Sequence, residues 1–137
     1  ISTDVLVGFP GETPEAFENT LRVLERAGIG RTHAFPFSPR KGTPAASYPD
    51  RVPDEILSER VRRVRDASDA RLAAYGRRFA GGTVRILVER SSDTGVEGLI
   101  PEYLRVEATG SAEQGTIANV LVAEAQGELL KGRVIAS

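Results

Sequence analysis

The first forty residues carry a hydrophobic pattern typical of strands that alternate with helices. An apolar run at residues 5–7 indicates a parallel strand that is buried on both faces. Apolar residues then recur at helical spacing, at Phe17, Leu21 and Leu24. A second strand-like run follows at about residues 32–37. The pattern therefore predicts a strand–helix–strand unit whose two strands run parallel.

The predicted helix has residues at both ends that suit those positions. Thr13 fits the N-cap, Pro14 fits the first helical position, and Glu15 places negative charge in the first turn. Gly28 suits the end of the helix. One helix does not cover both faces of a parallel strand pair. We therefore expect the unit either to complete a larger α/β body outside this chain or to dimerise.

A loop rich in Pro, Gly and Ser spans residues 38–52, and Pro53 then opens a long helix that reaches about residue 80. Residues 51–80 hold eight arginines against five acidic residues. This surplus of positive charge has two interpretations. The arginines would either contact the phosphates of a nucleic acid, or form a solvated helix face that is largely neutralised by acidic neighbours. An apolar stripe along the helix comprises Leu57, Val61, Val64, Leu72, Tyr75 and Phe79.

From Thr83 onward the hydrophobic period changes to two, which is typical of strands. Short strands at this spacing indicate a small antiparallel barrel. The predicted fold class is therefore α/β plus all-β. The predicted strands are Thr83–Arg90, Leu99–Ala108, Thr116–Ala125 and Glu128–Ala136. The predicted regions are 1–52, a linker helix at 53–81, and the barrel at 82–137.

Composition excludes several kinds of site. The chain has no cysteine, so we expect no disulfide, no thiolate metal site and no cysteine nucleophile. Its one histidine, His33, lies mid-strand and is interpreted as a packed core residue; we predict no metal ligand and no catalytic residue. No apolar run approaches the roughly 20 residues of a membrane helix, and no signal peptide is visible. Because the chain starts at Ile1 and lacks methionine, we expect a missing N-terminal part.

Two loops that follow strands are candidate ligand sites. The segment Gly8–Thr13 (GFPGET) would either present backbone N–H groups to a ligand or form only a tight turn with an N-cap. The segment Phe35–Ala46 (FPFSPRKGTPAA) contains three prolines that pre-order it. Its Arg40 and Lys41 would bind an anionic group, although a rigid connector explains the segment equally well.

A third candidate lies in the predicted barrel. The segment Glu102–Val106 (EYLRV) places Tyr103 and Arg105 two residues apart, so both would share one face of a strand. An exposed aromatic ring beside a cation is how oligonucleotide-binding barrels hold bases. A tyrosine packed at the rim of the barrel explains the same spacing.

Taken together, these segments resemble the radical S-adenosylmethionine methylthiotransferases. The run Thr3–Thr13 (TDVLVGFPGET) is similar to a late strand of their barrel, and the segment from His33 to Ala46 is similar to the next strand and loop. The tail from about Gly82 resembles the TRAM domain, the small RNA-binding barrel that ends these enzymes. The TRAM-like strands are Glu102–Val106 and Leu130–Ile135 (LKGRVI).

The resemblance implies an activity. Residues 33–42 (HAFPFSPRKG) look closest to the branch called MtaB, so the implied enzyme is cytoplasmic and methylthiolates C2 of N6-threonylcarbamoyladenosine beside the anticodon of tRNA. The alternatives are isopentenyladenosine in tRNA, a ribosomal-protein aspartate, or a non-catalytic RNA-binding module. The implied cofactors of the full-length enzyme are S-adenosylmethionine and two 4Fe-4S clusters. Since the cluster cysteines are absent, this chain alone is expected to bind no cluster and to be inactive.

The resemblance also implies roles for individual residues. Residues 81–137 carry five basic and eight acidic side chains, so RNA binding is expected to use a local basic patch or the arginine-rich helix. The residues implied to border the cofactor are Val7, Gly8, Pro10, Phe37, Ser38 and Arg40. The residues implied to bind tRNA are Arg85, Tyr103, Arg105, Lys131 and Arg133.

Overall fold

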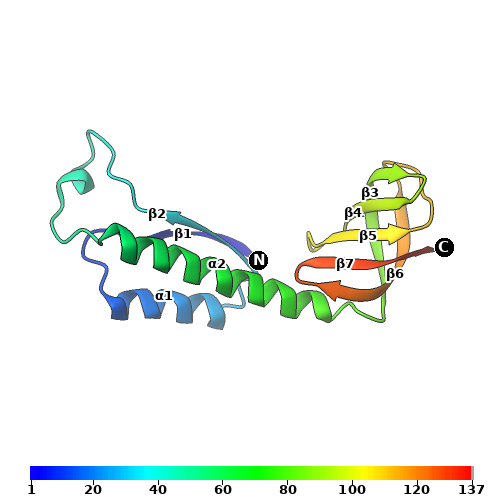
Figure 1. Cartoon of the computed structure of the whole chain (residues 1–137), viewed down its shortest axis with the longest axis horizontal. Coiled ribbons are helices and arrows are strands. Elements are labelled where there is room, and N and C mark those ends of the chain that lie inside the picture. Colours follow the sequence, from blue (N-terminus) through cyan, green and yellow to red (C-terminus); the bar gives the residue numbers. More distant parts are fainter. Residues whose placement is uncertain (137) are drawn as a thin grey trace. The chain divides into compact units, whose positions relative to one another are not determined.

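The structure is a computed structural model that describes residues 1–136 and divides into two units, Ile1–Arg71 and a second unit that begins at Leu72 (Figure 1). No helix in the described residues is long and apolar enough to cross a membrane. The first unit contains β1 (Ser2–Val7), α1 (Pro14–Arg26), β2 (Arg31–Pro36), the short 3-10 helix η1 (Pro44–Ser47) and most of α2 (Asp54–Arg77).

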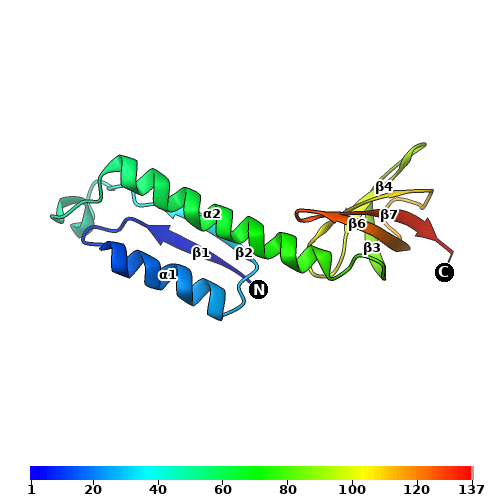
Figure 2. The same cartoon turned by 60° about the horizontal axis from the view of Figure 1, so that its bottom comes forward.

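The first unit has the predicted strand–helix–strand order. Strands β1 and β2 pair in parallel, with Asp4 opposite His33 and Leu6 opposite Phe35. Helix α1 begins as predicted, because the Thr13 side chain accepts a hydrogen bond of 3.1 Å from the backbone N–H of Ala16. Figures 1 and 2 show α1 and α2 running alongside the two strands.

Only one face of the β1–β2 pair is covered. Val7 and Ala34 are buried with the α1 residues Phe17 and Leu24, whereas Leu6 and Phe35 are 53% and 52% exposed on the opposite face. The prediction that the apolar run at residues 5–7 is buried on both faces is therefore wrong. Both helices pack on one side of the strands, so every second side chain of each strand faces solvent.

Helix α2 contributes to two separate cores. Val61 and Val64 are buried in the core of the first unit, and Leu72 is buried in the core of the second. The apolar stripe predicted along this helix is therefore present, but it divides between the two units near Arg71. A pattern with helical period identifies the buried face of a helix without indicating which partner covers it.

The second unit is a closed five-stranded barrel in the order β3–β4–β5–β7–β6. Its core includes side chains that are almost fully buried, among them Ile86, Val106, Val120 and Leu130. The strands are β3 (Thr83–Ser92), β4 (Gly95–Leu99), β5 (Arg105–Thr109), β6 (Ile117–Gln126) and β7 (Leu129–Ile135).

The prediction of an antiparallel barrel is wrong for one of its strand pairs. Strand β7 forms a hairpin with β6, and its other edge pairs with β5 in parallel. The barrel closes only if that free edge of β7 meets β5, and the two strands run in the same direction there. The other four strand pairs are antiparallel.

The predicted strand Leu99–Ala108 is also wrong, since β4 ends at Leu99 and β5 starts at Arg105. Ile100 and Leu104 are both buried, and the backbone N–H of Ile100 donates to the carbonyl of Leu104 at 3.1 Å. An unbroken strand with both residues inward would also point Glu102 into the apolar core. The chain instead turns at residues 100–104, and Glu102 is exposed.

Candidate functional site

Three backbone N–H groups of the turn after β1 are hydrogen-bonded within the first unit. The N–H of Gly8 donates to Glu12 Oε1 at 3.2 Å, the N–H of Glu12 donates to the carbonyl of Phe9 at 2.9 Å, and the N–H of Gly11 donates to the carbonyl of Asp50 at 2.8 Å. A Cβ atom at Gly8 would lie 2.2 Å from Leu57 Cδ1. The geometry therefore favours a close-packed structural turn over one that presents these groups to a ligand.

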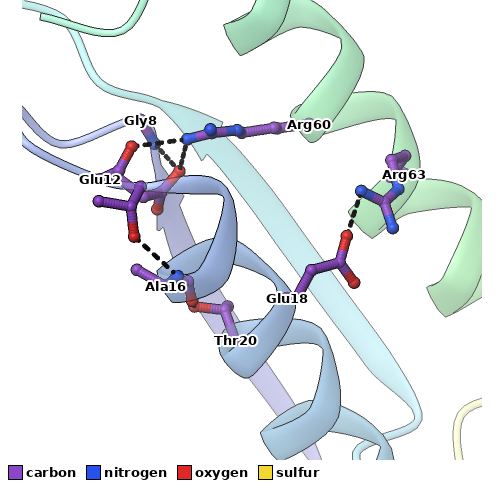
Figure 3. A network of polar contacts seen from close by, with 8 residues as sticks. Gly8, Glu12, Ala16, Glu18, Thr20, Arg60 and Arg63 are labelled. Atoms are coloured by element: carbon purple, nitrogen blue, oxygen red, sulfur yellow. Dashed lines mark hydrogen bonds and ion pairs between the residues drawn. The ribbon is translucent and has the colours of Figure 1, made fainter.

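A buried ion pair joins this turn to α2. Arg60 Nη1 lies 2.7 Å from Glu12 Oε1 and also donates to the Glu12 carbonyl at 3.0 Å (Figure 3). The two side chains are only 8% and 13% exposed, and the Arg60 guanidinium lies 5.4 Å from the ring centre of Phe17. Glu12 therefore accepts from both Gly8 and Arg60, which is why the carboxylate tolerates burial.

A second ion pair lies one turn further along α2, at the surface. Arg63 Nη1 is 2.6 Å from Glu18 Oε1, and both side chains are more than 40% exposed (Figure 3). The hydrogen bond from Arg63 lowers the pKa of Glu18, desolvation opposes that shift, and the charges of Arg63 and Arg22 add to the lowering. The folded pKa is thus below the usual 4.5, so the pair's contribution to stability is complete above that value and lost as the pH falls through the folded pKa.

We predict that the Glu18 carboxylate titrates below 4.5 in the chain and returns toward that value in Arg63→Gln. The reason is that the variant loses the charge-assisted hydrogen bond that favours the ionised carboxylate. NMR titration of the Glu18 side-chain carbon measures both midpoints. An identical midpoint in the two proteins contradicts the assignment.

The residues implied to border a cofactor lie in different environments. Val7 is 1% exposed and belongs to the core beneath the helices, and Gly8 is buried. Pro10 and Phe37 are half-buried. Ser38 and Arg40 are exposed in the loop after β2.

An aromatic cluster lies where these strands end. The Phe9 ring packs edge-on to Phe37, with centroids 5.5 Å apart, and to Tyr48, at 6.0 Å. Phe9 and Tyr48 are 41% and 44% exposed. The sequence reasoning gave these two rings no role. Tyr48 was missed because ten residues separate it from Phe37, and only the loop that carries η1 returns it to Phe9.

His33 is exposed on the open face of the β1–β2 pair, so its interpretation as a packed core residue is wrong. The cause is again that the helices cover the opposite face, which carries Thr32 and Ala34. Among residues 1–136 there is no group of three or more His, Cys, Asp and Glu side chains placed to hold a metal ion.

Several arginines of α2 are used within the first unit. Besides Arg60 and Arg63, Arg71 donates from Nε to the carbonyl of Ile29 at 2.6 Å and from Nη2 to Thr32 Oγ1 at 3.1 Å. Exposed arginines remain at Arg62 and Arg65. Three of the eight arginines of residues 51–80 thus hold the helix to its own unit, a role that neither interpretation of the basic surplus included.

The five residues implied to bind tRNA come from three strands of the barrel and one turn. Arg85 is on β3, Arg105 is at the start of β5, and Lys131 and Arg133 are on β7. Tyr103 lies in the turn before β5, so the prediction that it shares a strand face with Arg105 is wrong. The reason is that residues 100–104, which were predicted to be part of a strand, form a turn.

Lys131 has acidic neighbours on both sides. It lies opposite Glu107 on β5 and opposite Glu124 on β6, and Glu97 on β4 lies opposite Glu107. A surface pocket is lined by Glu97, Glu107 and Lys131 among others. The positive charge of Lys131 is therefore locally offset, which disfavours contact with a phosphate backbone.

Comparison with known proteins identifies homologues along nearly all of the chain, although no family model matches it. The chain is 34% identical over 139 residues to a tRNA-2-methylthio-N(6)-dimethylallyladenosine synthase of Rickettsia felis, which covers 98% of the chain and 31% of that protein. The synthase of the same name from Novosphingobium aromaticivorans is 35% identical over 136 residues, with the same coverage. The Ehrlichia canis protein is 44% identical over 86 residues, which is 63% of the chain and 20% of that protein. The chain thus spans less than a third of the length of these relatives.

Proposed function

We propose that this chain is part of a methylthiotransferase that modifies adenosine in tRNA. The observation that carries the proposal is the similarity to tRNA-2-methylthio-N(6)-dimethylallyladenosine synthases, which extends over 98% of the chain and so includes both structural units. The closed barrel is compatible with a TRAM-type RNA-binding domain. We assign residues 1–52 to the end of a radical-enzyme barrel, 53–81 to a linker helix and 82–137 to the TRAM-type domain.

The substrate we favour is N6-dimethylallyladenosine, because the relatives are named for its methylthiolated product. This choice replaces our first hypothesis from the sequence. The second candidate is N6-threonylcarbamoyladenosine, which the segment from His33 to Gly42 favours. The two substrates differ at N6, where one carries an apolar group and the other a carboxylate.

The proposed enzyme class uses S-adenosylmethionine and iron–sulfur clusters, and the residues present fit these groups unequally. The chain has no cysteine, so it does not fit a cluster, and no step through a cluster is derived from it. The aromatic cluster of Phe9, Phe37 and Tyr48 fits an adenine ring, since its rings are partly exposed where β1 and β2 end. Phe37 and Ser38 would therefore be the cofactor-facing residues of the implied set. The buried side chain of Val7 would support them from beneath. When bound, S-adenosylmethionine supplies the radical that activates the substrate carbon.

We predict that deleting the gene removes 2-methylthio-N6-dimethylallyladenosine from tRNA, and that N6-dimethylallyladenosine accumulates in its place. Mass spectrometry of nucleosides from total tRNA measures both. Loss of the methylthio form of threonylcarbamoyladenosine instead would establish the second candidate. Persistence of both methylthiolated nucleosides would contradict the proposal. Complementation with residues 1–137 alone is expected to fail, because this chain carries no cluster ligands.

A further inference from the structure

Two side chains of α2 contact the turn that carries Phe9. Arg60 donates from Nη1 to Oε1 and to the carbonyl of Glu12, at 2.7 and 3.0 Å (Figure 3). Leu57 lies so close to Gly8 that a Cβ atom at Gly8 would be 2.2 Å from Leu57 Cδ1. Glu12 in turn accepts from the backbone N–H of Gly8 at 3.2 Å. The two side chains of α2 therefore hold the turn at both ends, at Gly8 and at Glu12.

The shape of this turn depends on the contacts that hold it. Gly8 and Gly11 have φ values of +80° and +89°, in the left-handed region. Glycine reaches many other backbone conformations at little cost, so a turn with two glycines has little stiffness of its own. The contacts from α2 are shielded from water, since the side chains of Arg60 and Glu12 are 8% and 13% exposed. They are therefore well suited to select one shape of the turn.

The turn places the ring that joins the aromatic cluster. Phe9 contacts both Phe37 and Tyr48 edge-on, with centroids 5.5 and 6.0 Å apart. These two rings come from separate segments, since Phe37 follows β2 and Tyr48 follows η1. The Phe9 side chain is 41% exposed, so burial alone does not fix its ring. A shift of the turn would therefore move Phe9 and change the shape of the whole cluster.

We propose that Leu57 and Arg60 of α2 are positioning residues for ligand binding at the aromatic cluster. They act through the turn at residues 8–12, and without them the Phe9 ring leaves its place in the cluster. Helix α2 thus shapes the ligand site in addition to linking the two units. That the ligand is the adenine group of S-adenosylmethionine rests on the proposed function, whereas the positioning role rests on the contacts within the first unit.

The first measurement follows the cluster itself, without ligand or catalysis. In NMR spectra of residues 1–137, cross-relaxation between ring protons reports the contact of Phe9 with Tyr48. We expect this signal to weaken in Leu57→Ala, which removes packing, and in Arg60→Met, which removes charge. A common effect of two such different changes points to the turn that both residues hold. Arg63→Met is the matched control and is expected to keep the wild-type signal, because Arg63 pairs with Glu18 at the surface.

The second measurement is the affinity of the full-length enzyme for S-adenosylhomocysteine, which keeps the adenine ring and forms no radical. Calorimetric titration is expected to give a Kd raised on the order of tenfold in Leu57→Ala and Arg60→Met, the effect of one lost stacking contact. Arg60→Lys keeps a charged donor for Glu12 and is expected to restore part of the affinity. Leu24→Ala, in the buried core near the end of α1, is expected to lower stability without changing the Kd.

Two results would overturn the positioning role. One is a wild-type ring signal and a wild-type Kd in both Leu57→Ala and Arg60→Met. The other is an equal rise of the Kd in Leu24→Ala, which would show that any loss of stability in the first unit weakens binding. Failure of the proposed function looks different, because the wild-type enzyme itself would not bind S-adenosylhomocysteine. The ring signal in residues 1–137 would then still decide whether Leu57 and Arg60 position the cluster.

Discussion

Arg60→Met is expected to lower the free energy of unfolding of the first unit by about 3 kcal/mol, at the lower end of the range for breaking a buried ion pair. The substitution leaves the Glu12 carboxylate, 13% exposed, without the guanidinium that lies 2.7 Å away. The Gly8 N–H continues to donate to Glu12, so part of the stabilisation remains. Methionine retains most of the apolar stem of the arginine side chain. The loss of stability therefore measures the removed charge rather than lost packing. Urea denaturation and hydrogen exchange at the α1 amides measure the change.

The chain offers a matched control in Arg63→Met. Arg60 and Arg63 both lie over the Phe17 ring, at 5.4 and 5.1 Å, and both bond to a glutamate near or in α1. Arg63 and Glu18 are solvent-exposed, so that variant is expected to change stability far less. The double variant Glu12→Gln, Arg60→Met should recover part of the loss, because no buried charge is left unpaired. Equal losses in Arg60→Met and Arg63→Met would show that the buried pair adds nothing beyond the contact with Phe17.

Gly98→Ala is expected to destabilise the barrel by about 3 kcal/mol or more, at the upper end for overpacking. A Cβ atom at this position would lie 2.1 Å from the Leu87 carbonyl oxygen and 2.9 Å from the carbonyl carbon. Both are backbone atoms of β3 and belong to the β3–β4 pairing, so they cannot move aside as a flexible side chain would. Two-dimensional NMR and hydrogen exchange at amides of the core strands measure the effect.

Two further glycines test the reason for that effect. Gly132 on β7 has the same geometry, with its Cβ position 2.1 Å from the Leu121 carbonyl oxygen, so Gly132→Ala is expected to be equally damaging. Gly82 precedes β3, and its Cβ position has its nearest neighbour, the Phe79 carbonyl oxygen, at 3.4 Å. Gly82→Ala should therefore leave the barrel almost unchanged. A native-like spectrum and stability for Gly98→Ala would contradict the close-approach argument.

Local sequence predicted the elements of the first unit well. The run ending at Val7, the N-cap at Thr13 and the glycine stop at Gly28 each depend on residues within a few positions of one another. The change from helical period to a period of two also located the start of the barrel near Thr83. These features were predictable because short-range sterics and backbone hydrogen bonding decide them.

The candidate sites were predicted less well, because their residues meet only through long-range packing. The prediction treated Leu99–Ala108 as one strand although Glu102 interrupts its apolar face, and the structure has a turn there with Ile100 and Leu104 both in the core. Tyr103 and Arg105 were therefore placed on a shared strand that does not exist. The implied role of Lys131 took no account of its neighbours, and the pairing of β7 places Glu107 and Glu124 beside it.

By itself, the sequence determined the strand–helix–strand order of the first unit, the ends of α1 and the absence of cysteine ligands, because each follows from residue type and local spacing. The tertiary structure decided that β5 and β7 pair in parallel and that His33 is exposed. It also decided that Arg60 and Arg71 bond to backbone carbonyls within the first unit. It placed the five implied tRNA-binding residues on three strands and in the turn before β5. The physical reason is that a strand's partners, and hence the neighbours of its side chains, depend on which distant segments close the sheet.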